Sequence, residues 1–324
     1  MNQGQLRLKM VAFRWPLLWT AALLLSGQLQ FSIHGQLLTQ GTNALHVILY
    51  GFLAVLLVRA FQKLNTGSDD LPFRSLLYSA LLAGLIAAVL ELAQIPISRD
   101  ANLADWLRSC AGILGFIGLF AGIAPAFRVR FQRLPIVRFG VLLISAAVIV
   151  SVVAPFFGWV FAYSERARSF PVIVDFDRAW STYFVRANNS DFDRVRAPHG
   201  IGNDQWLGRV RIKKGKYSGI AMIEPYPDWR EHEQLILAGY LDSPDEQSIM
   251  LRIEDRAHTN ETPDRYQREL RLRPGRNQIE IPLRTVRNAP SQRIMNMGEI
   301  RRLVLYDVAP TEPYVVYLEY ISLE

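Results

Sequence analysis

The stretch Glu91-Leu-Ala-Gln-Ile-Pro-Ile-Ser-Arg99-Asp-Ala-Asn-Leu-Ala-Asp105-Trp-Leu-Arg-Ser-Cys-Ala-Gly112-Ile-Leu-Gly115 places two carboxylates, an amide and a guanidinium in an apolar part of the chain. Ionisable groups inside or beside a hydrocarbon layer are costly, so they indicate a functional site. Upstream, small residues share one helical face with Glu91, and downstream a stripe of glycines follows: Gly112, Gly115, Gly118 and Gly122. We therefore expect the two flanking helices to pack closely, with Glu91 facing the interior of a helical bundle.

The distribution of charge divides the 324 residues into two parts of different composition. Residues 1–162 carry 12 Lys or Arg against 5 Asp or Glu, whereas residues 163–324 carry 24 of each, so the net charge of +7 belongs to the first part. The basic excess lies in loops between apolar segments, which is typical of membrane topology and not of a nucleic-acid surface. We expect no nucleic-acid partner.

The first part reads as a transmembrane bundle of about five helices, over residues 1–162. Five apolar segments are long enough to cross a bilayer, which takes about 20 residues: residues 15–33, 43–61, 75–95, 103–124 and 139–162. A cleaved signal peptide competes for the first segment, but the text that follows it makes a poor cleavage site. Lys and Arg gather after the second and fourth segments, so the positive-inside rule predicts a cytoplasmic N-terminus and an extracytoplasmic C-terminal half.

The second part changes to a period of two, which is typical of half-buried strands. The clearest alternating runs are residues 248–255, 266–272, 277–283 and 314–324, with turn signals such as Arg273-Pro-Gly-Arg276 between them. About nine strands with little helix predict an all-β, two-sheet antiparallel sandwich over residues 172–324. Residues 163–171 are polar and are predicted to link the two domains.

The membrane half resembles a known family. The ordered polar set on its apolar segments, from a His and Tyr through Glu-x-x-Gln, Arg and Asp to Gly-x-x-Gly, resembles the VanZ-like membrane proteins: His46, Tyr50, Glu91, Gln94, Arg99, Asp105, Gly112 and Gly115. The resemblance covers roughly residues 40–125. It departs at Ser109, where the family pattern usually has Asn. The resemblance implies a membrane protein and attaches no reaction to it.

Within this set, the catalytic candidates are His46, Glu91, Arg99 and Asp105, and the candidate ligand-binding residues are Tyr50 and Gln94. In one interpretation Arg99 pairs with an anionic headgroup, and His46 or Glu91 acts as general acid or base. In the other, the same side chains form an internal polar network that fixes helix register. The spacing leaves both open, and whether any reaction is catalysed stays open with them. No His-x-x-x-His or paired-cysteine pattern indicates zinc.

The second half resembles the galactose-binding-domain-like jelly rolls, which include carbohydrate-binding modules. The resemblance rests on strand-like and turn-like sequences over residues 170–324, such as Asp175-Phe-Asp177, Asp264-Arg-Tyr266 and Tyr317-Leu-Glu-Tyr-Ile-Ser-Leu. It implies a carbohydrate ligand. Together with the preference of calcium for oxygen ligands, it also suggests a structural calcium ion at Asp175, Asp177 and Glu319. No other cofactor is indicated.

Aromatic and polar side chains of this half are the candidates for contacting sugars. Trp206 and Trp229 lie in turn-rich text and are predicted either to stack on sugars or to pack in the core, whereas Trp180 reads as core. The side chains predicted to bond hydroxyls are Asp255, His258 and Arg265. No glycosidase pair is predicted, since the distance between carboxylates defines that mechanism.

Together these features predict an integral membrane protein of a bacterial envelope, with a polar site at the outer leaflet and an outward carbohydrate-binding domain. Its partners would be the lipid bilayer and a carbohydrate or lipid-linked glycan. Two alternatives remain. The protein is a non-catalytic, membrane-anchored module that binds glycan or protein, or it is a membrane-embedded hydrolase of lipid-linked phosphates.

Overall fold

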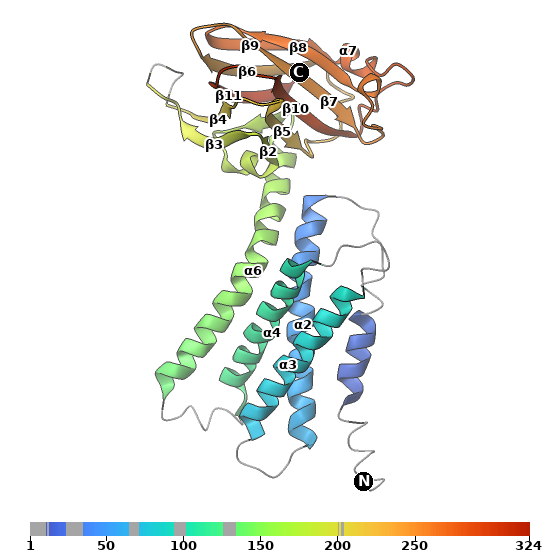
Figure 1. Ribbon diagram of the computed structural model, residues 1–324, viewed down its shortest axis with the longest axis vertical. Helices are drawn as coiled ribbons and strands as arrows, with labels where there is room; N and C mark the ends of the chain where they lie inside the picture. Colours follow the sequence, from blue (N-terminus) through green and yellow to red (C-terminus); the bar gives the residue numbers. More distant parts are fainter. Residues whose placement is uncertain are drawn as a thin grey trace. The chain divides into compact units, whose positions relative to one another are not determined.

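The computed structural model describes residues 11, 13–23, 35–64, 71–93, 102–125, 134–199, 201 and 204–324 (Figure 1). The chain forms two compact units, Met1–Trp159 and Val160–Glu324. The first is helical and the second is an antiparallel β-sandwich, as predicted.

Four helices are long and apolar enough to cross a membrane. They are α2 (Gln36–Leu64), α3 (Leu71–Leu92), α4 (Leu103–Ile123) and α6 (Pro135–Ser169). They correspond to the second to fifth predicted segments. Of the first predicted segment, residues 15–23 are helical and residues 24–33 lie outside the described residues.

The glycine stripe on α4 contacts two other helices. An added Cβ at Gly112 would lie 2.2 Å from the carbonyl oxygen of Val47 on α2, while Gly115, Gly118 and Gly122 face α6 at Ile149, Ser145 and Leu142. Small residues allow such close approach between apolar helices. The α3–α4 contact predicted from the stripe also exists, but it is made by Trp106, whose Nε1 donates to the carbonyl oxygen of Gly84 at 3.2 Å.

The second unit packs two antiparallel sheets face to face. One has the order β3-β4-β11-β6-β9 with β1 paired to β11, and the other has the order β2-β5-β10-β7-β8. The strands are β1 (Val172–Asp175), β2 (Val185–Asn188), β3 (Ser190–Arg196), β4 (Trp206–Ile212), β5 (Tyr217–Ile223), β6 (Gln234–Asp242), β7 (Gln247–Asp255), β8 (Tyr266–Leu272), β9 (Gly275–Pro282), β10 (Ile300–Val308) and β11 (Tyr314–Leu323). Consecutive strands mostly alternate between the sheets, in the manner of a jelly roll.

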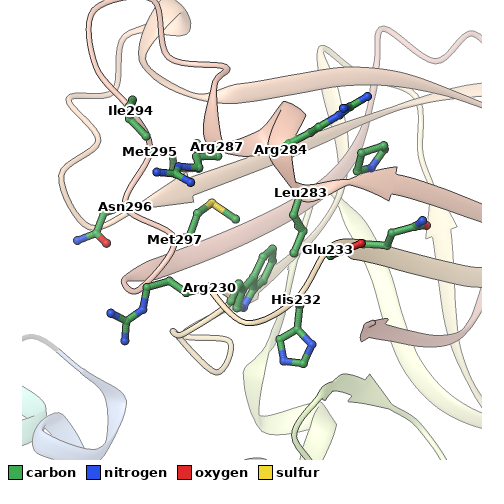
Figure 2. Close-up of a pocket in the computed structure, with 13 residues that line it drawn as sticks. Arg230, His232, Glu233, Leu283, Arg284, Arg287, Ile294, Met295, Asn296 and Met297 are labelled. Atoms are coloured by element: carbon green, nitrogen blue, oxygen red, sulfur yellow. The ribbon is translucent and has the colours of Figure 1, made fainter.

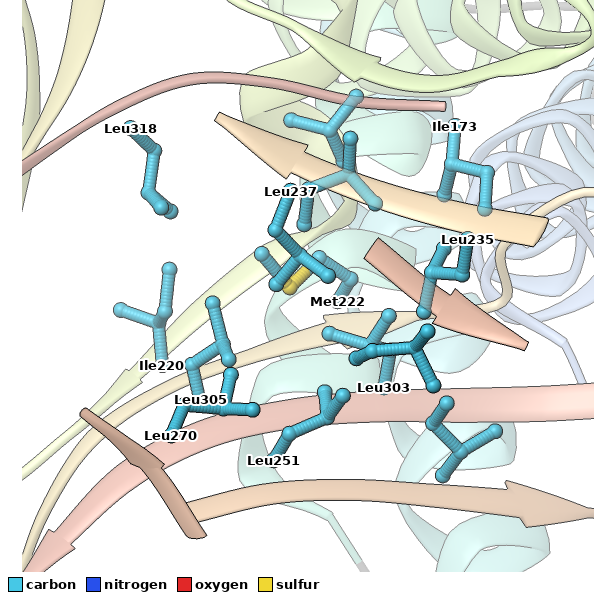
Figure 3. Close-up of a cluster of buried hydrophobic side chains, with 14 of the residues drawn as sticks. Ile173, Ile220, Met222, Leu235, Leu237, Leu251, Leu270, Leu303, Leu305 and Leu318 are labelled. Carbon is cyan, nitrogen blue, oxygen red and sulfur yellow. The ribbon is translucent and has the colours of Figure 1, made fainter. Parts of the chain in front are cut away.

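Alternating apolar side chains of both sheets form the core between them (Figure 3). On β7, Ile249, Leu251 and Ile253 point inward, and the predicted period of two is thereby confirmed. Three short helices lie between strands along the chain: η2 (Ala179–Phe184), η3 (Thr262–Asp264) and α7 (Leu283–Arg287). Trp180 on η2 is buried in the core of the unit, as predicted.

Most of the predicted linker is helical. Residues 163–169 continue α6, supported by an ion pair between Glu165 and Arg168 at 2.9 Å. The helix ends just before Pro171, because the residue preceding a proline is disfavoured in the helical region. Within the second unit, the hydroxyl of Tyr163 and the guanidinium of Arg166 both donate to Glu224, which follows β5.

Candidate functional site

Glu91 lies at the end of α3, and its carboxylate has a structural partner. The side chain is 8% exposed, and its Oε1 accepts a hydrogen bond from the backbone N–H of Asn102 at 2.8 Å. Asn102 in turn caps α4, because its Oδ1 accepts from the N–H of Ala104 at 2.9 Å. The inward position predicted for Glu91 is confirmed, and the carboxylate ties α3 to the start of α4.

The other described members of the candidate polar set also have partners. His46 Nδ1 lies 3.4 Å from Ser109 Oγ, and its ring stacks on Tyr50 with centroids 5.9 Å apart. Asp105 pairs with Arg108 one turn along α4. Gln94 and Arg99 lie outside the described residues. These contacts match the packing-network interpretation, while a ligand site that includes Arg99 stays a prediction.

In the second unit, five polar or aromatic side chains form one row across the outer face of the six-stranded sheet. The register places Asp193 of β3 opposite Arg209 of β4, Arg209 opposite Tyr317 of β11, Tyr317 opposite Tyr240 of β6, and Tyr240 opposite Arg276 of β9. Core residues flank the three central members along their strands, namely Val210, Val316, Leu318 and Leu241, so the pleat turns these members to the outer face, although Tyr317 is only 5% exposed there. We call this set the tyrosine row, and the strands that carry it can be followed in Figure 1.

Each end of the tyrosine row is an ion pair. Arg209 donates from Nε to Asp193 Oδ1 at 2.8 Å and from a second nitrogen to Oδ2, and this hydrogen bonding lowers the pKa of Asp193. At the other end, Nε and one terminal nitrogen of Arg276 lie 3.3 Å from Glu319 Oε2. The charge of Glu319, with a contribution from Tyr240, raises the pKa of Arg276. The aromatic pair is therefore flanked by hydrogen-bonding groups of both signs.

A hollow of about 440 Å³ adjoins this face. It gathers four side chains that the sequence analysis selected from distant positions: Asp175, Asp177, Trp206 and Glu319. Glu319 belongs to the hollow and also pairs with Arg276, so the hollow and the tyrosine row are continuous.

The carboxylates of the hollow each have a partner already. Asp175 Oδ1 accepts from the N–H of Asp177 at 2.9 Å, Asp177 Oδ1 accepts from the N–H of Trp206 at 2.8 Å, and Glu319 faces Arg276. In the part of the chain that the structure describes, no three His, Cys, Asp or Glu side chains are placed to hold a metal ion together. Calcium at these residues stays a prediction.

Trp206 is half-buried, and arginines lie over its ring. The guanidinium carbons of Arg194 and Arg196 are 4.0 Å and 4.9 Å from the ring centroid, within the range of cation–π attraction. Arg196 also pairs with Asp204 at 3.0 Å. These contacts hold the indole at the edge of the hollow.

Trp229 is not part of this surface. Its side chain is 0% exposed, and its Nε1 donates to the carbonyl oxygen of Tyr226 at 2.7 Å. A ring without exposed surface cannot stack on a sugar, so the structure contradicts that interpretation and supports the core alternative.

Asp255 and His258 are predicted to bond sugar hydroxyls, but both belong to an internal network. Asp255 is 0% exposed and accepts from both terminal nitrogens of Arg293 and from the N–H of Asn296. His258 lies between the carbonyl oxygen of Asp264, at 2.9 Å from Nδ1, and Arg252, at 3.1 Å from Nε2. The prediction for these two side chains is wrong, because their polar atoms are already paired inside the fold.

Arg265 lies apart from the tyrosine row. It is half-buried and donates to Gln267 Oε1 at 3.0 Å and 2.7 Å. Among the described residues, no contact connects it with the row or with the hollow, so a ligand role for Arg265 stays a prediction.

The internal network predicts a specific sensitivity to acid. Hydrogen bonds from the side chain of Arg293 and the backbone of Thr259 lower the pKa of Asp264 to about 2, from an ordinary value of about 3.9. Ionised Asp264 thus stabilises the fold above about pH 4, and this stabilisation is lost as the pH falls from about 4 to about 2. Thermal unfolding between pH 5 and pH 2 should show a shallower loss of stability in Asp264→Asn than in wild type. Parallel curves would contradict the assignment.

The tyrosine row is the part of the site that sequence patterns could not assemble. The sequence marks Tyr240 as an aromatic residue in a strand-like segment. Arg209, however, is predicted to belong to a basic hairpin, Arg276 to a turn and Tyr317 to a strand. Their alternation with buried neighbours predicts outward positions. Only the strand register makes them one row.

Comparisons with known proteins give distant matches. No protein-family model matches the chain, and no curated protein matches it. Several solved structures resemble the C-terminal sandwich. The family 11 carbohydrate-binding module from Clostridium thermocellum, in complex with a β-1,3-1,4-mixed-linked tetrasaccharide, is 12% identical with a TM-score of 0.34; the match covers 43% of this chain and 86% of the module.

Two further structures give similar values. The family 30 carbohydrate-binding module of a cellulosomal cellulase of the same organism is 10% identical with a TM-score of 0.32, over 44% of this chain and 91% of that one. An exo-β-agarase is 13% identical with a TM-score of 0.37, over 47% of this chain and only 24% of the agarase. The ligand of this chain must therefore be inferred from its own residues.

Proposed function

We propose that this chain is a membrane-anchored glycan-binding protein, and that the tyrosine row with its adjoining hollow is the glycan site. The observation that carries the proposal is the row itself: the half-buried Tyr240, with the buried Tyr317 beside it on the same sheet face, and an Arg–carboxylate pair at each end. Sugars present apolar ring faces and many hydroxyl groups, which aromatic rings and charged hydrogen-bonding groups complement.

The dimensions of the row favour an oligosaccharide. It crosses five strands, and four inter-strand spacings amount to about 19 Å. This exceeds the width of one sugar ring, so the ligand is a glycan chain lying across the strands. At the Arg276 end, the chain would reach the hollow, where Trp206 and the carboxylates of Asp175 and Asp177 line the wall.

The membrane part of the proposal concerns orientation. Arg59 and Lys63 near the end of α2, Arg74 near the start of α3 and Arg138 near the start of α6 would share one side of a membrane crossed by these helices in alternation. The positive-inside rule makes that side the cytoplasm of a bacterial cell and exposes the sandwich outside the inner membrane. The VanZ-like character of the bundle is part of this proposal, as is a lipid-linked envelope glycan as ligand.

For the bundle we propose an anchoring role. The contacts of Glu91 with Asn102 and of His46 with Ser109 join α3 to the start of α4, and α2 to α4. Side chains used in this way stabilise helix register, which supports the packing-network interpretation over the catalytic one.

Binding of glycans to the full chain in a neutral detergent tests the proposal. We expect Tyr240→Ala to weaken binding of a responsive bacterial envelope glycan by about tenfold, since one sugar-stacking ring contributes on the order of 1–1.5 kcal/mol. Tyr217→Ala is the matched control, because Tyr217 is 46% exposed on β5 of the opposite sheet. Equal affinities of the two variants, or no binding of any glycan by wild type at millimolar concentration, would overturn the proposal. Titrations with and without calcium test the ion as well.

A further inference from the structure

The second unit has a larger hollow, of about 820 Å³, that the tyrosine row does not use (Figure 2). Its floor is apolar and buried, formed by Leu283, Met295, Met297 and Trp229. Above this floor the lining is polar. It contains His232, Asn296, the carboxylate of Glu233 and three arginines: Arg230, Arg284 and Arg287. The lining is thus predominantly cationic around an apolar base.

The arginines differ in how far they are engaged. Arg230 is paired with Asp228 through two hydrogen bonds of 2.8 Å and 2.6 Å. Arg284 and Arg287 are exposed, and among the described residues neither guanidinium has an ion-pair or hydrogen-bond partner. They are three residues apart on α7, and Figure 2 shows Arg287 with Arg230 and Asn296 at one side of the pocket and Arg284 at the other.

Backbone hydrogen bonds hold the walls of this hollow together. The N–H of Leu283 donates to the carbonyl oxygen of Glu233 at 2.8 Å. The N–H of Met295 donates to the carbonyl oxygen of Arg287 at 2.9 Å, and the N–H of Trp229 donates to the carbonyl oxygen of Met297 at 2.8 Å. The third wall is also anchored to Asp255 through the N–H of Asn296 at 2.7 Å. Three separate segments are therefore fixed around the space before any ligand enters, which lowers the cost of binding.

We propose that this hollow binds a phosphate ester. A phosphate presents three acceptor oxygens and up to two negative charges, and planar guanidinium groups bind it through paired, charge-assisted hydrogen bonds. Arg284 and Arg287 supply unpaired donors, and the apolar floor accommodates the organic part of the ester. Two sources share this chemistry: a phospholipid headgroup and a soluble sugar phosphate.

The test uses the full chain in a neutral detergent and two anionic probes, glucose 1-phosphate and dihexanoyl phosphatidic acid. Glucose and dihexanoyl phosphatidylcholine are the matched probes without net charge. By calorimetric titration we expect at least one anionic probe to bind more tightly than its matched probe. The tighter of the two anionic probes identifies the source as lipid or soluble ester.

The double variant Arg284→Gln/Arg287→Gln should weaken this binding by about tenfold or more, because it removes two charge-assisted interactions. The control is Arg268→Gln/Arg271→Gln, which removes two exposed arginines with the same spacing from β8. An equal loss in the control, no loss in the double variant, or no binding of either anionic probe at millimolar concentration would overturn the proposal.

This outcome is independent of the glycan site. The Arg284→Gln/Arg287→Gln variant should bind a neutral glycan as wild type does, and Tyr240→Ala should bind the phosphate ester as wild type does. Failure of one site therefore leaves the other measurable in the same preparation.

Discussion

Replacing Arg293 with alanine is expected to lower the free energy of unfolding of the C-terminal unit by about 3–5 kcal/mol. Asp255 is 0% exposed, and Arg293 donates to both of its oxygens, with a distance of 2.7 Å to Oδ1. Among the described residues, the variant would leave the buried carboxylate with the N–H of Asn296 as its remaining donor. Because domains are stable by only about 5–15 kcal/mol, such a loss removes a large share of the total.

Denaturant unfolding of the full chain in detergent, followed by tryptophan fluorescence, measures this effect. The control is Arg265→Ala, since the guanidinium of Arg265 bonds only to the side chain of Gln267 in the described contacts. We expect the control to cost less than about 1 kcal/mol, as for most surface substitutions. Similar losses for both variants would show that the Asp255–Arg293 pair contributes no more than a surface contact.

The same pair explains why part of the site prediction failed. Asp255 ends a predicted strand and His258 follows in a predicted turn, where polar side chains are commonly exposed. The sequence does not show that Arg293, 38 residues later, returns to cover Asp255. The sequence does not show the burial of Trp229 either, because it depends on contact with a distant segment: the N–H of Trp229 donates to the carbonyl oxygen of Met297. These errors concern contacts between distant segments.

Local patterns performed better where one physical cause dominates. Apolar segments of sufficient length predict the helices α2, α3, α4 and α6, because hydrocarbon length alone sets the requirement. Alternation predicts β7, β8, β9 and β11, because one face of each strand is buried. The linker role of residues 163–171 stays a prediction, and the structure adds that α6 continues through Ser169.

The candidate site occupies a middle position. Asp175, Asp177, Glu319 and Trp206 were selected through strand text and a fold resemblance, and they line one hollow. Tyr317 and Arg276 required knowledge of the register, because a slip of one residue would turn each to the opposite face. Strand order and register follow from the packing of the whole sandwich, and no single strand encodes them.

A second large effect is expected in the bundle, for Gly112→Ala. An added Cβ at this position would lie 2.2 Å from the carbonyl oxygen of Val47 and 2.7 Å from its Cα. These are backbone atoms of α2 and cannot move aside as the end of a flexible side chain can. The helices must separate, and overpacking of this kind typically costs about 1–3 kcal/mol. Separation would also lengthen the contact between His46 and Ser109, which flank this crossing.

Gly84→Ala is the matched control, because it adds the same methyl group to a helix of the same bundle. No atom lies within 4 Å of the Cβ position at Gly84, and alanine favours a helix over glycine by about 1 kcal/mol. Thermal unfolding in detergent, followed by helical circular dichroism, should therefore move in opposite directions: down for Gly112→Ala and unchanged or up for Gly84→Ala. Equal midpoints would mean that α2 and α4 do not approach at Gly112. A lower midpoint for Gly84→Ala with a higher one for Gly112→Ala would place the tight helix crossing on α3, at Gly84.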